Sequence, residues 1–78
     1  MSWKVIDNRL TRTYQLEHFT EIVSKLSVLV DIADKHNHHP DFTVFEYNKI
    51  RFELWTHYKN AMTDSDYKLA EEIDHLFD

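Results

Sequence analysis

The chain has 78 residues and a formal net charge of −5, so it is one small domain (residues 1–78) whose acidic balance argues against direct binding of nucleic acid. It contains no cysteine, which excludes disulfide bonds and thiolate metal sites and favours a reducing compartment. The N-terminal residues lack the long apolar stretch of a signal peptide or membrane helix, so we expect a cytoplasmic protein with no membrane partner.

The first alternating run predicts a β-hairpin. Because glycine is absent from the chain, Asn or Asp must fill the left-handed positions of tight turns. The pair Asp7-Asn8 lies between residues 3–6 and 10–16, in which apolar and polar side chains alternate. We therefore expect two antiparallel strands with one face buried.

A helix is predicted for residues 21–35, with Thr20 as its N-cap. Val28 and Ile32 fall nearly opposite its apolar stripe, so they would face water in an isolated subunit. Single exposed apolar residues are common, but a homodimer or homotetramer formed through this helix and a sheet edge would also account for them. The residues expected in the core are Phe19, Ile22, Val23, Leu26, Leu29, Val30 and Ala33.

The second half of the chain repeats the pattern. Asn48-Lys49 is the predicted turn between strands at residues 42–47 and 50–57. Thr63 is the predicted N-cap of a last helix, with Asp66 three residues later. The resulting order is ββαββα, which predicts an α+β fold of two layers, with a four-stranded antiparallel sheet and both helices packed on one face.

The six histidines of the chain suggest a chemical site. His38 and His39 lie where the first helix ends, and His57 lies at the end of the last predicted strand, so all three can meet at one rim of the sheet. Imidazole titrates near pH 6.5, and neighbouring imidazoles resist being charged together. Such a cluster can hold a neutral base beside a protonated acid, as acid–base catalysis requires.

The spacing of these histidines is also compatible with a structural role or a metal site. His38 and His39 can simply end a helix, where positive charge is favourable, while His57 is a half-exposed strand residue. A zinc site built from His36 and these three histidines is the second alternative, although adjacent histidines seldom bind one ion. We expect no metal.

Several motifs resemble those of the pterin-4a-carbinolamine dehydratases, also called 4a-hydroxytetrahydrobiopterin dehydratases. They are Asp34, the run His38-His39-Pro40, Tyr47, the pair Thr56-His57 and Asp66, with further agreement at Trp3 and Leu69-Ala70. The resemblance covers nearly the whole chain. It implies an enzyme that removes the 4a-hydroxyl group of a carbinolamine pterin as water to give quinonoid dihydropterin, with the pterin as substrate and no metal or other cofactor.

The resemblance also implies roles for individual residues. His38, His39 and His57 correspond to the active-site histidines of the family, and we expect the first and last to exchange protons while His39 holds the substrate. The residues expected to bind the substrate or to orient a histidine are Asp66, Asp34, Pro40 and Phe42. Asp66 can also serve as a helix-capping residue, and Asp34 can be no more than a solvated carboxylate.

The chain departs from the family pattern at two informative positions. Phe42 stands where Trp is common, which keeps an aromatic surface but removes the indole hydrogen bond. Ala61 stands at a usual glycine, so either it resists a positive φ or Asn60 takes the strain. Some family members also act as dimerisation partners of a transcription factor. A non-catalytic protein-binding module is therefore the alternative function.

Overall fold

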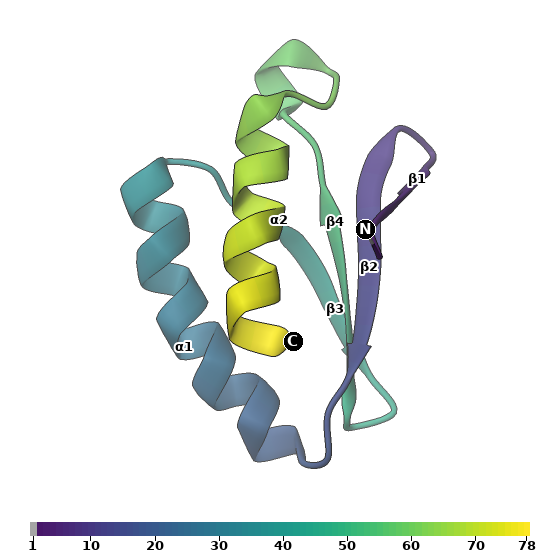
Figure 1. The fold of residues 1–78 in the computed structure, drawn as a ribbon, viewed down its shortest axis with the longest axis vertical. Helices are drawn as coiled ribbons and strands as arrows, with labels where there is room; N and C mark the ends of the chain where they lie inside the picture. Colours follow the sequence, from purple (N-terminus) through teal and green to yellow (C-terminus); the bar gives the residue numbers. More distant parts are fainter. Residues whose placement is uncertain (1) are drawn as a thin grey trace.

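The structure, a computed structural model, describes residues 2–78 and has two layers (Figure 1). One layer is a four-stranded antiparallel sheet in the order β1-β2-β4-β3, and both helices cover the same face of it. The predicted α+β class and ββαββα order are confirmed. The elements are β1 (Lys4–Ile6), β2 (Arg9–Gln15), α1 (Phe19–His36), β3 (Asp41–Phe45), β4 (Lys49–Leu54), the 3₁₀ helix η1 (His57–Lys59) and α2 (Asp64–Phe77).

Polar or large residues adopt the left-handed backbone of both hairpin turns. In the first turn these are Asp7 and Asn8, with φ of 51° and 66°, as predicted. In the second they are Glu46 and Tyr47, so the predicted turn was wrong by two residues. Lys49 already pairs with β3 and belongs to the sheet, which moves the turn toward the N-terminus.

Strand β4 is shorter than the alternation predicted. It ends at Leu54, whereas the predicted strand extended to His57. Beyond it, Thr56 forms an isolated bridge with Ala61, and the residues between them make the turn that contains η1. His57 therefore lies outside the sheet, in a turn whose ends are held together by backbone pairing.

The core lies between the sheet and the helices. Alternate residues of β2 and β4 point into it, and α2 supplies the buried face of the second layer. Tyr14, Phe52 and Phe77 pack there ring against ring, with centroids 5.2–6.1 Å apart. The buried cluster comprises Trp3, Leu10, Tyr14, Ile22, Leu29, Ile50, Phe52, Leu54, Leu69, Ala70, Ile73 and Phe77.

Helix α1 begins at Phe19 after the N-cap His18, two residues earlier than predicted, so the prediction of Thr20 as the cap was wrong. Phe19, Val23 and Val30 were expected in the core but are 52–56% exposed. Figure 1 shows the reason: α1 lies along β3, the edge strand on the opposite side of the sheet from β1. One flank of the helix therefore has no strand beneath it.

The other flank of α1 faces α2. The Lys25 ammonium donates a hydrogen bond to the carbonyl of Leu76 at 2.7 Å, which ties the two helices together. Ile32 lies on this flank and is half-buried, so the prediction that it faces water was wrong, whereas Val28 is 49% exposed, as predicted. The helix thus carries exposed apolar side chains on both sides of its buried face.

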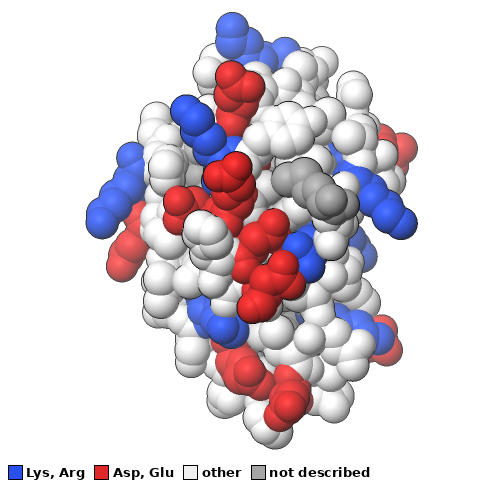
Figure 2. All heavy atoms as spheres, in the orientation of Figure 1, with Lys and Arg blue, Asp and Glu red and all other residues white. Residues whose placement is uncertain are grey.

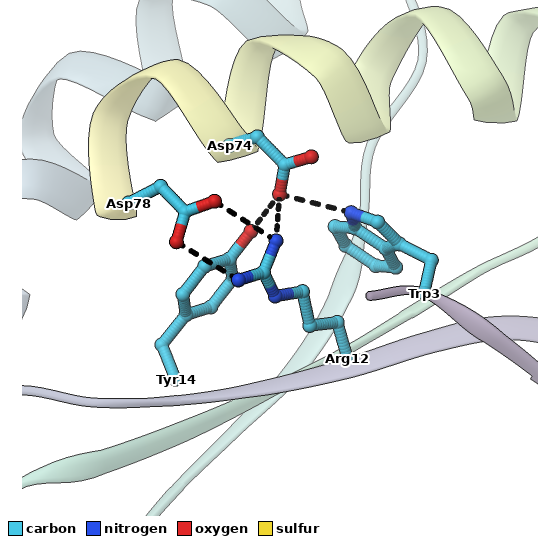
Figure 3. Close-up of polar contacts among 5 residues, drawn as sticks. All are labelled: Trp3, Arg12, Tyr14, Asp74 and Asp78. Carbon is cyan, nitrogen blue, oxygen red and sulfur yellow. Dashed lines mark hydrogen bonds and ion pairs between the residues drawn. The ribbon is translucent and has the colours of Figure 1, made fainter. Parts of the chain in front are cut away.

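A polar cluster fastens the end of α2 to the sheet (Figure 3). The Oδ1 atom of Asp74 accepts hydrogen bonds from the Trp3 indole at 3.0 Å, from Arg12 at 2.7 Å and from the Tyr14 hydroxyl. Arg12 also donates two hydrogen bonds to Asp78, at 2.8 and 3.1 Å. Burial, together with the bond to Asp74, raises the pKa of Tyr14 well above its usual value.

The outer surface of the helical layer is acidic. Figure 2 shows Asp and Glu side chains gathered over the middle of this face, in keeping with the net charge of −5. Such a surface repels a phosphate backbone. Within residues 2–78, neither helix combines the length and apolar character needed to cross a membrane.

Candidate active site

The three predicted histidines line one pocket of about 310 Å³. It lies where α1 passes into β3 and where the chain turns after β4, and Figure 1 shows both segments at the same end of the molecule. The fold thus joins two segments that are almost twenty residues apart in the sequence. The lining residues are Asn37, His38, His39, Pro40, Asp41, Thr56, His57 and Tyr58.

The end of α1 places the first two histidines. Asn37 caps the helix in the left-handed conformation, with φ of 50°, a position that glycine usually fills. The next backbone N–H, that of His38, donates back to the carbonyl of Ala33 at 3.1 Å. This closed turn fixes the direction in which the chain leaves the helix, and with it the positions of His38 and His39.

The turn after β4 places His57. The backbones of Thr56 and Ala61 pair through two hydrogen bonds of 2.9 and 3.4 Å, which close the turn. Asn60 adopts the left-handed conformation with φ of 52°. The backbone strain in this turn therefore falls on Asn60 and not on position 61, where the family commonly has glycine. Ala61 needs no positive φ.

His38 is held by a buried carboxylate. Asp66 is 0% exposed and accepts hydrogen bonds from His38 Nε2 at 2.5 Å, from Thr56 Oγ1 at 3.0 Å and from the Thr63 backbone N–H at 2.9 Å. An ionised carboxylate only accepts, so with Asp66 ionised this contact places a proton on Nε2 of His38, and Nδ1 is the ring nitrogen that Asp66 does not engage. Asp66 both caps α2 and orients His38. Because it is buried, it cannot contact a ligand directly and can affect one only through His38.

The other two histidines lie near exposed carboxylates. Nε2 of His39 is 2.9 Å from Oδ1 of Asp34, within hydrogen-bonding distance. Nε2 of His57 is 3.9 Å from Oδ2 of Asp41, which is too long for a hydrogen bond. Each imidazole therefore has its own carboxylate neighbour, but only the one beside His38 is shielded from water.

Pro40 and Phe42, the other two residues predicted to bind the substrate, do not line the same set of pockets. Pro40 lines the histidine pocket, but Phe42 lines a separate apolar pocket of about 120 Å³ between α1 and β3. His39 and Pro40 border both pockets. The sequence motifs did not single out Asp41 or Tyr58, although Asp41 directly follows the His-His-Pro run and Tyr58 directly follows His57.

The histidines do not converge on one point. Among residues 2–78, three or more possible metal ligands come within 4.8 Å of one another only at Glu17, His18 and Glu21, at the beginning of α1. That group lies at the opposite end of the helix from the pocket (Figure 1). Each pocket histidine instead lies near a different carboxylate: Asp66 for His38, Asp34 for His39 and Asp41 for His57.

Comparison with known proteins decides the family. Residues 1–76 match the family described as "Pterin 4 alpha carbinolamine dehydratase". The chain belongs to this family. Two relatives carry provisional names as pterin-4-alpha-carbinolamine dehydratases. The one from Sulfurisphaera tokodaii is 39% identical over 74 residues, covering 95% of this chain and 78% of its own, and the one from Herpetosiphon aurantiacus is 36% identical over 75 residues, covering 96% and 77%.

Solved structures agree with this assignment. A transcriptional coactivator/pterin dehydratase from Brucella melitensis matches with a TM-score of 0.91 and 25% identity, over 99% of this chain and 83% of that one. A pterin dehydratase-like protein described as a RuBisCO assembly factor matches with a TM-score of 0.79, over 97% of this chain and 89% of that one. At 15% identity, this likeness shows the fold alone. The resemblance inferred from the motifs is confirmed.

Proposed function

We propose that this protein dehydrates a 4a-hydroxytetrahydropterin to quinonoid dihydropterin by acid–base catalysis. The observation that carries the proposal is one pocket, in a chain of the pterin dehydratase family, lined by His38, His39 and His57. A flat, polar heterocycle suits such an open pocket, because three imidazoles and the carboxylate of Asp41 border it.

The reaction requires two proton transfers. An acid gives a proton to the departing 4a-hydroxyl group, and a base takes the proton from N5, so that one molecule of water leaves. Imidazole does both near neutral pH, and a positioned acid or base typically contributes about 10²- to 10⁴-fold in rate. The proposed steps use neither a metal nor a redox cofactor.

Different surroundings suit the histidines to different tasks. His38 exchanges a proton at Nδ1 while buried Asp66 fixes its orientation through the hydrogen bond to Nε2. His57 is 64% exposed and makes no hydrogen bond with Asp41, so its Nε2 is free to reach the substrate. His39 is already bonded to Asp34, and we assign it to holding the pterin.

The direct test is whether purified protein accelerates breakdown of a 4a-hydroxytetrahydropterin, followed by the absorbance of the quinonoid product. His57→Ala should lower kcat by about 10²- to 10⁴-fold. The matched control is His75→Ala, which removes an exposed imidazole from α2, outside the pocket. Absence of acceleration by the parent protein would overturn the activity, and a fully active His57→Ala variant would overturn the site.

We also infer that the chain self-associates through α1 and the edge strand β3. Besides Val28 on one flank, Val23 and Val30 are more than half exposed on the other. Phe42 on β3, which lines the same apolar pocket as Val30, is 48% exposed. The unpaired edge of β3 adds backbone hydrogen-bonding groups to this surface. Burying it against a second copy would offset the small core of a chain this short.

A protein-binding role is the second candidate, and the same exposed apolar surface favours it. The related Brucella melitensis protein is described both as a coactivator and as a dehydratase. A protein-binding module would keep its partner contact when His57 is replaced, but would lose it when Val30 is made charged. A dehydratase should instead lose turnover when His57 is replaced and keep it when Val30 is made charged.

A further inference from the structure

The imidazole of His57 rests against the indole of Trp55. Their ring centroids are 5.1 Å apart and the planes meet at 69°, the edge-to-face arrangement that aromatic rings prefer. On the same indole ring lies the guanidinium of Arg9, with its central carbon 4.8 Å from the ring centroid. The three side chains form a stack next to the histidine pocket.

The sheet register creates this stack. Leu10 of β2 pairs with Leu54 of β4, so one further step of this register brings Arg9 opposite Trp55, the residue directly after β4. Both leucines point into the core, and the alternation of a β-strand sends Arg9 and Trp55 to the uncovered face of the sheet. Cross-strand neighbours at such positions are close enough to pack directly.

His57 differs from the other two pocket histidines in how it is held. His38 and His39 have hydrogen bonds of 2.5 and 2.9 Å to carboxylates, whereas the nearest carboxylate oxygen to His57 is 3.9 Å away. With its side chain 64% exposed, the imidazole would otherwise rotate freely among staggered rotamers. The contact with Trp55 takes the place of an orienting hydrogen bond.

The polar atoms of the stack support this interpretation. Nε of Arg9 and Nε1 of Trp55 are both shielded from solvent, and neither has a hydrogen-bond partner among residues 2–78. Unpaired buried donors are rare and unfavourable, so hydrogen bonding does not explain why these side chains lie together. Packing of the guanidinium on the indole face does, and it leaves the indole fixed beneath His57.

We propose that Trp55, clamped by Arg9, is the positioning residue that fixes the orientation of the His57 imidazole for proton transfer. The inference rests on the proposed dehydratase function of the pocket. It assigns Trp55 no contact with the reacting atoms. Its effect is to raise the fraction of time in which Nε2 of His57 is directed at the substrate.

The test replaces the indole by side chains with and without an aromatic face. Trp55→Leu keeps apolar bulk but removes the ring, and should lower kcat about 3- to 10-fold with KM little changed, the loss expected for one aromatic contact. Trp55→Phe should restore most of the rate. The matched control is Phe45→Leu, because Phe45 is another half-buried aromatic ring on the uncovered face with an arginine over it, Arg51 at 5.5 Å.

A second measurement does not depend on turnover. The ring current of Trp55 should displace the NMR resonances of the His57 imidazole protons, and Trp55→Leu should remove this displacement while Phe45→Leu preserves it. In a His57→Ala background, adding Trp55→Leu should cause no further loss of kcat, because its effect passes through the imidazole. Arg9→Leu should weaken the displacement and lower kcat in the same direction as Trp55→Leu.

The outcomes separate the two proposals. If His57→Ala lowers kcat but Trp55→Leu behaves like Phe45→Leu in both measurements, the positioning role is wrong and the proposed function stands. If His57→Ala leaves the rate unchanged, the catalytic role of His57 is wrong, and so is the positioning role of Trp55 that depends on it. Should Trp55→Leu not fold, Trp55→Phe and Arg9→Leu take its place in both measurements. The parent protein gives a further test, because unshifted His57 resonances there would by themselves refute the contact.

Discussion

Nε2 of His38 lies 2.5 Å from Oδ1 of Asp66, and this carboxylate is completely buried at the beginning of α2. The same side chain accepts the backbone N–H of Thr63, the N-cap of that helix, and the hydroxyl of Thr56. One residue therefore joins the cap of a helix, the turn that carries His57 and the orientation of His38. Stability and the candidate chemistry are coupled at this point.

Asp66→Asn should damage both properties. The amide keeps the size of the side chain but places a donor or a weaker acceptor against His38, Thr56 and the Thr63 N–H, so the free energy of unfolding should fall by about 1–3 kcal/mol. Loss of an orienting carboxylate should lower kcat by about 10- to 100-fold. Urea unfolding and the turnover assay measure the two effects. Asp64→Asn, in the same helical turn but exposed, is the control; equal behaviour of both variants would contradict the coupling.

The left-handed cap at Asn37 should be required for activity as well as for stability. Asn37→Gly fits φ of 50° without strain and should leave kcat and the free energy of unfolding nearly unchanged. Asn37→Val should cost about 1–2 kcal/mol, because a β-branched side chain opposes this conformation, and the displaced His38 should reduce kcat. Glu46→Val imposes the same strain in the far hairpin turn, where φ is 48°, and should cost stability alone. Equal kcat for the two valine variants would argue against this role of the cap.

Tyr14 predicts a loss of stability in alkali. Its pKa is higher in the folded chain than in the unfolded chain, so its contribution is complete below the unfolded value of about 10 and is lost as the pH rises through that value toward the folded one. Tyr14→Phe removes the hydrogen bond to Asp74 and should be about 1 kcal/mol less stable at pH 8. The difference from the parent should narrow above pH 10 in urea unfolding. Parallel pH profiles of the two proteins would contradict the prediction.

Two valines on α1 separate the possible self-association surfaces. Val30→Glu places a charge beside Phe42 and the edge of β3, whereas Val28→Glu places one on the flank near α2. If β3 and its neighbouring flank form the contact, Val30→Glu should shift the protein to monomer in size-exclusion chromatography with light scattering. Val28→Glu, a similarly exposed position, should then have the smaller effect. A parent protein that is already monomeric at high concentration would refute self-association.

The sequence determined the order of the elements because that order depends on local patterns. Alternation in β2 and β4, the helical spacing in α1 and the Thr63 cap of α2 each act over a few residues, so they could be recognised without coordinates. The second hairpin turn was misplaced because its position depends on the pairing between two strands and not on a local pattern. In a chain without glycine, Asn48 was the expected left-handed residue, but the pairing of β3 with β4 required Glu46 and Tyr47.

Only the tertiary structure decided which side of α1 is buried and how each histidine is held. The position of α1 beside β3 leaves Val23 and Val30 exposed, although their spacing alone is typical of a core face. The motifs indicated His38, His39 and His57 but could not show that one carboxylate partner is buried, that another is out of reach, or that Trp55 lies against His57. The pairs His38–Asp66 and His57–Asp41 are distant in sequence, and the packing of Trp55 on His57 depends on the turn after β4, so local side-chain patterns do not encode them.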